Sequence, residues 1–241
     1  MRHNGWLMNY ETGDHTIGKL LPAEKYFVEH PDWYMYSPPD DPGSGEYNYE
    51  NGLKIVKETR PESWYRIAEA QRWLPWQICP SSSGVLDATT KAVRELLAAK
   101  YEKWQYPPKV VWVSQIDGRW ECKCDACLAI KQEQGTPSAV WVRFVNAIAK
   151  RIEKDYPDVL IATMAFAHTE KPPANLRARD NVLIYSIPVS SNRKVPLTDI
   201  VHGQYVAKWC DIAKHVYIWE HETNFRNWVQ PHPNHFVGPA N

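Results

Sequence analysis

Three cysteines, Cys122, Cys124 and Cys127, lie within six residues, and a fourth, Cys79, ends a predicted strand earlier in the chain. Four cysteine thiolates are a typical ligand set for structural zinc, which they hold tetrahedrally at Zn–S distances of about 2.3 Å. Neighbouring parallel strands lie about 5 Å apart, so the end of one strand and a cluster after the next can converge. The sequence therefore predicts a structural four-cysteine zinc site with no open position for water.

Two other states of these thiols stay open at this stage. Cys79 could form a disulfide with one of the clustered cysteines, leaving a second pair, or all four could remain free thiols. The fifth cysteine, Cys210, lies in a predicted helix beside Trp209, where we expect a buried free thiol. We expect no organic cofactor.

Two carboxylates, Asp117 and Glu220, each follow the apolar run of a predicted parallel strand. In a barrel of parallel strands these ends converge on one face, where enzymes place their chemistry. A pair of carboxylates flanking a glycosidic bond is what glycoside hydrolysis requires, one as proton donor and one as nucleophile or base. The alternative is structural: Asp117 caps a turn at Gly118, and the glutamates pair with neighbouring cations.

Aromatic and polar side chains near the same strand ends are candidates for sugar contacts. The chain has 12 Trp and 13 Tyr but only 5 Phe, and the first two types combine an apolar face with a polar edge. Glu222 competes with Glu220 for the catalytic role. The residues expected to contact a substrate are His15, Gln115, Trp219, His221, Glu222 and Asn224.

Five apolar runs separated mostly by helical patterns predict an α/β protein with a parallel sheet. The strands are expected at 73–79, 110–117, 159–166, 181–188 and 215–219, and helices at 61–72, 85–104, 138–154 and 203–214. This pattern favours a segment of a (β/α)8 barrel over residues 61–241. A doubly wound sheet is the alternative, but no glycine-rich phosphate loop follows a strand. Residues 1–60 are expected to be a long loop region on the substrate face of the barrel, with a short helix at 22–30 that ends at Pro31.

Bulk composition excludes some partners. The formal net charge is zero, from 28 basic and 28 acidic side chains, so nothing indicates nucleic acid or an anionic membrane surface as a partner. No apolar run is long enough for a membrane span, and the N-terminus lacks a signal-peptide pattern. The last residues read as loop, so we expect a piece of a longer protein. Composition does not determine the oligomeric state.

Several strings of residues resemble the domain-of-unknown-function family 4838. They are HTIGKLLPAEKYFVEHPDWY, SQIDG followed by CKCDAC, PSAVWVRFVNAIAKRIEKDYPDV, and YIWEHETNF, in this order. The resemblance implies a bacterial protein similar to polysaccharide-degrading enzymes, exported to the periplasm or beyond. It also implies an incomplete (β/α)8 barrel here, with the first strand or two and the last strand missing. The cysteines also resemble those of some β-galactosidases, in which a lone cysteine and a C-x-C-x-x-C group bind structural zinc after the fourth barrel strand.

That second resemblance implies Asp117 as the acid/base and Glu220 as the nucleophile, although Ile116-Asp117 replaces the Asn-Glu pair of those enzymes. The sequence thus predicts a glycoside hydrolase acting on a poly- or oligosaccharide. The alternative is a barrel that binds carbohydrate without cleaving it. A histidine-dependent zinc hydrolase is disfavoured, because no histidine pair has the spacing of a metal-binding element.

Overall fold

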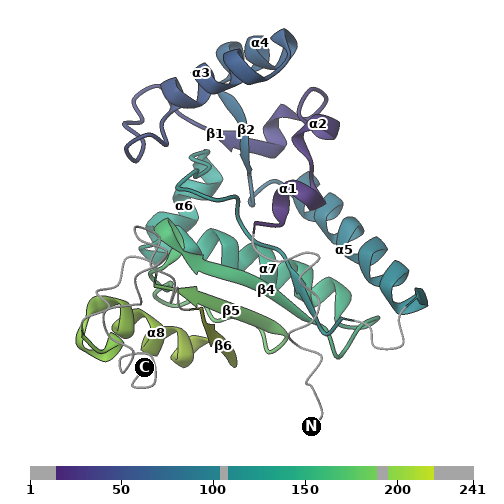
Figure 1. Ribbon diagram of the computed structural model, residues 1–241, viewed down its shortest axis with the longest axis vertical. Coiled ribbons are helices and arrows are strands. Elements are labelled where there is room, and N and C mark those ends of the chain that lie inside the picture. Colours follow the sequence, from purple (N-terminus) through teal and green to yellow (C-terminus); the bar gives the residue numbers. More distant parts are fainter. Residues whose placement is uncertain (1–14, 104–107, 189–194, 220–241) are drawn as a thin grey trace, which may run out of the picture.

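A computed structural model describes residues 15–103, 108–188 and 195–219. These residues form a four-stranded parallel sheet with its helices and a smaller layer built on a two-stranded antiparallel sheet (Figure 1). The larger part comprises α5 (Ser83–Lys103), β3 (Val110–Trp112), α6 (Asp125–Gln134), α7 (Ser138–Ile152), β4 (Leu160–Phe166), η4 (Ala167–Thr169), β5 (Val182–Ile187), η5 (Leu197–Asp199), α8 (Val201–Ile212) and β6 (His215–Ile218). The fold is therefore mixed α/β, as expected.

The parallel sheet follows the order of the sequence, β3-β4-β5-β6, and has no point at which the strand order reverses. Each neighbouring pair is parallel, and Val113 N–H donates to the Ala162 carbonyl at 2.8 Å, one residue past the end of β3. These strands form where the chain has apolar, largely β-branched runs, which is typical of strands buried on both faces. The expected strand at 110–117 is shorter than predicted, because residues 114–117 leave the ladder.

The two faces of this sheet pack differently. Along β4, Ile161 and Ala165 pack with residues of α5, α6, α7 and α8 in the main core. The alternate residues Leu160, Ala162 and Met164 belong to a second cluster. Among the described residues, that second cluster contains side chains from the strands and from Trp219, which follows β6, and none from a helix. The helices of the described ranges that pack on the sheet thus cover one face of it.

Helix α7 shows how the sequence builds the covered face. Residues Trp141, Phe144, Val145, Ile148 and Ile152 recur at helical spacing and are all buried, as predicted. The helix packs against β4, and α5 and α6 pack against it in turn. Helix α6, which was not predicted, begins directly after Cys124 and ends at Gly135, whose φ of 70° suits a glycine at this left-handed position.

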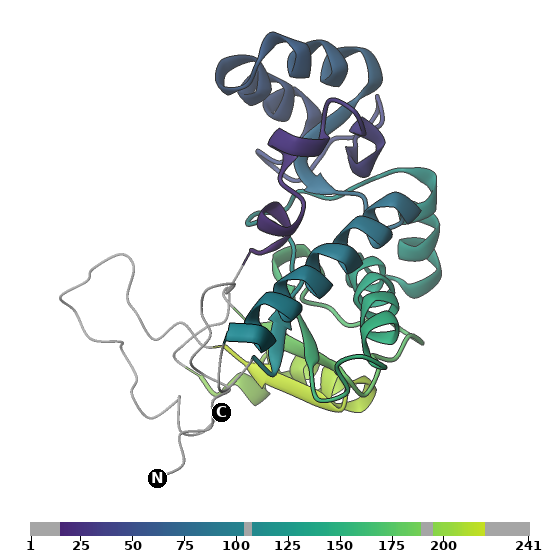
Figure 2. The same cartoon turned by 90° about the vertical axis from the view of Figure 1, so that its right-hand side faces the viewer.

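The smaller layer lies beyond one end of the parallel sheet (Figure 2). It contains α1 (Ile17–Leu20), α2 (Ala23–Tyr26), η3 (Pro31–Trp33), β1 (Tyr34–Tyr36), α3 (Tyr49–Thr59), α4 (Glu62–Gln71) and β2 (Trp73–Ile78). Residues 15–60, expected to be mainly loop with a short helix at 22–30, contain three α-helices, a 3-10 helix and a strand, and α2 lies within the expected helix. Asn48 caps α3 by accepting the Asn51 N–H at 2.9 Å, and Val56 of this helix is fully buried.

Strand β2 requires a second correction. We expected it in the parallel sheet, but it pairs antiparallel with β1. Pro75 lies inside β2 and has no N–H to donate, so it is tolerated only where a strand has an unpaired edge. This proline was the sequence signal against a central strand, and hydrophobic pattern alone does not specify a strand's partner or direction.

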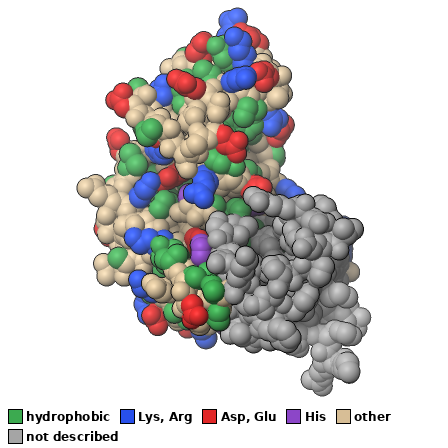
Figure 3. Space-filling view, turned by 60° about the vertical axis from the view of Figure 1, so that its left-hand side comes forward, with side chains coloured by type: hydrophobic (Ala, Val, Ile, Leu, Met, Phe, Trp, Pro, Cys, Tyr) green, Lys and Arg blue, Asp and Glu red, His purple; other side chains and the backbone are tan. Residues whose placement is uncertain are grey.

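The surface shows no dominant charge on the face drawn in Figure 3, where acidic and basic side chains are interspersed. Among the described residues, no helix has the length and apolar character needed to cross a membrane.

Candidate metal centre and strand-end site

The four predicted cysteine ligands come together between the two layers. Cys79 follows β2 directly, whereas Cys122 and Cys124 precede α6 and Cys127 lies in its first turn. Their sulfur atoms all lie within 4.8 Å of one another. Cys79, Cys122 and Cys127 are buried, and Cys124 is partly exposed. The cluster thus joins the small layer to the helices that cover the parallel sheet.

The spacing of these sulfurs fits a tetrahedral metal ion. Four sulfurs at about 2.3 Å from a central zinc lie about 3.8 Å apart. Cys79 Sγ is 3.6 Å from Cys124 Sγ and 3.8 Å from Cys127 Sγ. A disulfide needs about 2.05 Å between its sulfurs, and all four cysteines are free. The geometry is therefore compatible with a metal site.

Neighbouring polar groups and the thiols themselves hydrogen-bond to the sulfurs of the cluster. The Tyr36 N–H donates to Cys122 Sγ at 3.4 Å, and Ser81 Oγ lies 3.1 Å from Cys127 Sγ. Hydrogen bonding with Cys122 lowers the pKa of Cys124, whereas hydrogen bonding with Cys124, together with burial, holds the pKa of Cys122 well above its usual value. The thiols share protons in this way because four negative charges cannot coexist so closely without a cation.

Cys210 differs from its prediction. It lies in α8 beside Trp209, as expected, but its side chain is exposed, while Trp209 is buried and donates from Nε1 to the Glu170 carbonyl at 2.8 Å. Adjacent residues on a helix point in different directions, so the burial of Trp209 leaves Cys210 on the outer side.

At the end of β3, the structure brings together three predicted site residues, His15, Gln115 and Asp117. His15 Nδ1 lies 2.8 Å from the Gln115 carbonyl oxygen, and His15 Nε2 lies 3.6 Å from Asp117 Oδ1. The chain after His15 lies along β3: Thr16 Oγ1 donates to the Trp112 carbonyl, and Ile17 N–H donates to the Ser114 carbonyl. These hydrogen bonds to the backbone at the end of β3 hold His15 next to Gln115, from which it is separated by a hundred residues in the sequence.

Asp117 lies in a tight turn and faces solvent. Its side chain is 75% exposed, and Oδ1 accepts the Gly118 N–H at 2.7 Å. Gly118 has φ 95°, and a Cβ there would lie 2.3 Å from the Tyr47 ring, so the turn requires glycine. The structural reading of Asp117 as a turn cap is therefore confirmed for one oxygen, and its exposure leaves the carboxylate accessible to a ligand.

Gln115, which we predicted to contact a substrate, is instead buried inside the protein. Its side chain is fully buried, and Nε2 donates to the Phe166 carbonyl at 3.1 Å and to Thr169 Oγ1 at 2.9 Å. Thr169 Oγ1 also accepts the Phe166 N–H at 3.1 Å. The amide thus links the end of β3 to the end of β4 and holds the backbone that carries His15 and Asp117.

Between Phe166 and Thr169, the backbone is strained at Ala167, which has φ 53°. A non-glycine residue in this region costs about 1–2 kcal/mol. We therefore expect Ala167→Gly to raise the free energy of unfolding by about 1 kcal/mol in urea denaturation. Ala165→Gly, in the regular part of β4, is the matched control and should destabilise the protein. Equal destabilisation by both changes would contradict strain at Ala167.

The remaining predicted contacts fall at the end of β6 or beyond it. Trp219 is partly buried in the second cluster, and its backbone N–H donates to the Ser186 carbonyl at 2.9 Å. Phe166, of the same cluster, lies 5.8 Å from the His15 ring. Glu220, His221, Glu222 and Asn224 lie outside the described residues, so their predicted roles stay predictions.

Two histidines near the end of β4 were not predicted. His202 Nδ1 pairs with Glu170 Oε1, and both side chains are mostly buried. His168 lies in η4 and faces the loop of Gly118, and its Nδ1 is buried without a hydrogen-bond partner among the described residues. It borders a cavity of about 10 Å³ next to Cys122 and Cys127. Nothing in the local sequence distinguishes these histidines from solvated ones.

Burial lowers the pKa of His168 to about 4, and the nearby Lys131 and Arg119 act in the same direction. Lys123 also lowers it, whereas a hydrogen bond to the Gly118 backbone opposes the shift. In the unfolded chain the His168 imidazole binds a proton near pH 6.5, whereas in the folded protein it does so only near pH 4. The contribution of His168 to the free energy of unfolding is therefore complete above pH 6.5 and is lost as the pH falls toward 4. Urea denaturation at pH 7.5 and 5.0 should show a loss about 2 kcal/mol larger in the wild type than in His168→Gln. Identical losses would contradict a buried neutral imidazole.

Fold and site together define an α/β protein with sequentially ordered parallel strands, helices on one sheet face and a four-cysteine cluster at the junction of two layers. The chain belongs to the family described as a domain of unknown function, DUF4838, whose model matches residues 2–241. The predicted family is thereby confirmed. Comparisons with curated proteins and with solved structures find no match.

Proposed function

We propose that this protein is a glycoside hydrolase acting on a poly- or oligosaccharide, built on a (β/α)8 barrel of which β3–β6 form consecutive strands. The observation that supports it most is the convergence of His15 and Asp117, 3.6 Å apart, at the carboxyl end of a sequentially ordered parallel sheet. In barrels, catalytic groups come from these strand ends. The first and last strands of the barrel would come from residues beyond the four strands described.

The packing of the sheet favours a barrel over a doubly wound sheet. A doubly wound sheet has helices on both faces and a reversal of strand order. Here the side chains that the structure describes on the second face come from the strands and from Trp219, among them Trp112, Leu183 and Ile187, as in the inward-facing layers of a barrel. The aromatic side chains Phe166 and Trp219 of this face are suited to contact sugar rings at the strand ends.

In this proposal Asp117 protonates the glycosidic oxygen and Glu220 acts as nucleophile or base. His15 orients the Asp117 carboxylate through the contact at Oδ1. Retention of configuration predicts the two carboxyl groups about 5–5.5 Å apart, and inversion about 6.5–9.5 Å. The ion held by the four cysteines is zinc with a structural role, because four protein ligands leave no position for water or substrate.

One observation favours the second candidate, a barrel that binds carbohydrate without cleaving it. The Asp117 side chain is 75% exposed, whereas general acids commonly lie in apolar surroundings that favour the protonated form.

The deciding experiment is a screen of the full-length protein against a panel of aryl glycosides and polysaccharides, with product formation and binding measured in parallel. Hydrolysis supports the first proposal, and binding without turnover supports the second. Folded, zinc-loaded protein that neither hydrolyses nor binds any substrate of the panel would contradict both proposals.

A further inference from the structure

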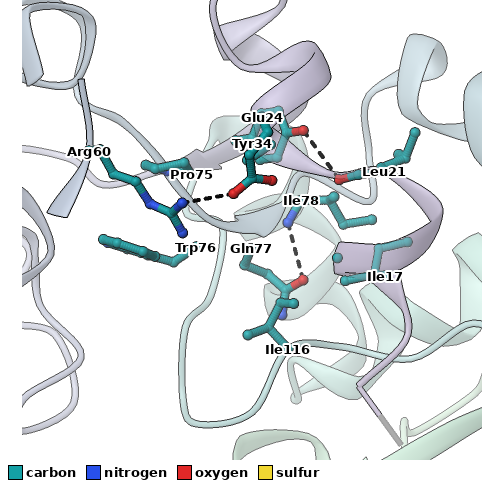
Figure 4. Close-up of a pocket in the computed structure, with 12 residues that line it drawn as sticks. Ile17, Leu21, Glu24, Tyr34, Arg60, Pro75, Trp76, Gln77, Ile78 and Ile116 are labelled. Carbon is teal, nitrogen blue, oxygen red and sulfur yellow. Dashed lines mark hydrogen bonds and ion pairs between the residues drawn. The ribbon is translucent and has the colours of Figure 1, made fainter. Parts of the chain in front are cut away.

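A cavity of about 260 Å³ lies between the small layer and the segment after β3, separate from the strand-end site. Residues of α1, α2, β1 and β2 line it, together with Arg60 at the end of α3 and Ile116 next to Asp117 (Figure 4). Most of its walls are apolar, with Ile17, Leu21 and Pro75 among them. Small-molecule sites commonly combine such walls with a few placed polar groups.

Two residues that line this cavity each carry a buried hydrogen-bond donor with no partner among the described residues. Gln77 is 2% exposed, and its Oε1 accepts the Ile78 N–H at 3.1 Å, which identifies the other atom as the amide nitrogen. That nitrogen, Nε2, is buried and unpaired, and so is Nε of Arg60. The Gln77 side chain extends between Ile78 and Ile116 in Figure 4. A buried donor without a partner is destabilising, so a ligand acceptor that reaches it would be stabilising.

Charge at the cavity is already balanced. Arg60 Nη1 lies 2.7 Å from Glu24 Oε1, and its guanidinium lies over the rings of Trp64 and Trp76 at 5.2 and 5.6 Å. An anionic ligand would meet the Glu24 carboxylate, whereas a hydroxyl group can accept from Gln77 or Arg60 and donate to Glu24. The polar groups therefore suit a neutral ligand rich in hydroxyl groups.

From this arrangement we infer that the cavity binds one neutral sugar ring, as a subsite apart from the reacting bond; this inference rests on the proposed function for the class of ligand. The cavity is slightly smaller than the range of about 300–1,000 Å³ for drug-sized ligands, which suits a single pyranose. The indole of Trp76 and the aliphatic walls contact the apolar face of the ring, and the unpaired donors bind its hydroxyl oxygens.

A single trapped water is the competing account of Gln77, because this residue also borders the 10 Å³ cavity beside the cysteines. That cavity has room for about one water. Arg60 does not line it, so the Nε donor of Arg60 is independent of that account.

The test is titration of the full chain with methyl glucoside, methyl galactoside and methyl xyloside by calorimetry and ligand-observed NMR. Gln77→Met removes one donor, and Arg60→Lys keeps the ion pair with Glu24 but removes Nε. Each variant should weaken binding of the preferred sugar about tenfold. Gln134→Met changes a buried glutamine whose Oε1 accepts from Asn175, outside this cavity, and should leave affinity unchanged. If Gln77→Met does not fold, Arg60→Lys carries the test.

Absence of binding by folded protein would overturn the inference, as would binding that neither variant weakens. Tighter binding of glucuronate or glycerol than of all three glycosides would overturn the neutral-ring assignment. Asp117→Asn separates this inference from the proposed function. This variant should lose hydrolysis and keep sugar binding in the cavity. Wild-type protein that binds sugar there but hydrolyses no substrate contradicts only the proposed hydrolase, and hydrolysis without binding in the cavity contradicts only the subsite.

Discussion

Cys124→Ser is expected to abolish stoichiometric zinc binding and to lower the free energy of unfolding by about 4–5 kcal/mol. Metal binding to a preformed thiolate site contributes directly to folding, and apparent values for zinc-finger peptides reach about 10–16 kcal/mol. Loss of one of four ligands removes a large share of that contribution and leaves three clustered thiols without a cation. For a chain of this size, the melting temperature should fall by roughly 10–20 °C. Metal analysis and thermal denaturation followed by circular dichroism measure both effects.

Cys124 is the preferred position because it is the least buried of the four, so a hydroxyl there adds little other disturbance. Cys210→Ser is the matched control, since Cys210 is exposed on α8 and should change stability by less than about 0.5 kcal/mol. A strong chelator should reproduce the effect in the wild type and have none in Cys124→Ser. Cobalt uptake with the visible absorption of a tetrahedral thiolate complex would confirm the ligand set. Purified protein that carries no metal and is as stable with serine as with cysteine would rule the site out.

Asp117→Asn is expected to reduce kcat/KM for an unactivated glycoside by about 10²–10⁴-fold, the usual contribution of a positioned proton donor. Asparagine keeps the size of the side chain and an oxygen that can accept the Gly118 N–H, so the turn should remain intact. Substrates with good aryl leaving groups need less protonation, so they should lose less activity. The fall of activity at high pH, which reports deprotonation of the acid, should disappear in the variant.

Asp40→Asn is the control, because Asp40 is an exposed aspartate with no part in the strand-end site. His15→Gln should have an intermediate effect, since His15 contacts Asp117 Oδ1 rather than the substrate. Wild-type turnover by Asp117→Asn on unactivated substrates would remove Asp117 from the mechanism. A uniform loss on all leaving groups would indicate a role other than proton donation.

Much of the fold was predictable because the relevant patterns are local. The apolar runs of β4 and β5 and the spaced apolar residues of α7 each specify an element within a few residues of chain. The placement of β2 was not predictable in the same way, since a strand's partner depends on distant residues. The cysteine cluster was predicted on the assumption that β2 and β3 are parallel neighbours. The sulfurs converge even though β2 pairs with β1 instead.

The sequence by itself determined the residue chemistry of this protein: the four thiols, three of them close together in the chain, the turn at Asp117-Gly118, and the order of alternating strands and helices. Only the tertiary structure decided which distant groups meet. It placed His15 beside Asp117, buried Gln115 against Thr169, left Ala167 strained, and put Gln77 in a cavity with an unpaired donor. The physical reason is that hydrophobic periodicity and the residue preferences of turns act over a few residues of chain. Contacts across about a hundred residues depend on how separate layers pack, and a single sequence does not record that packing.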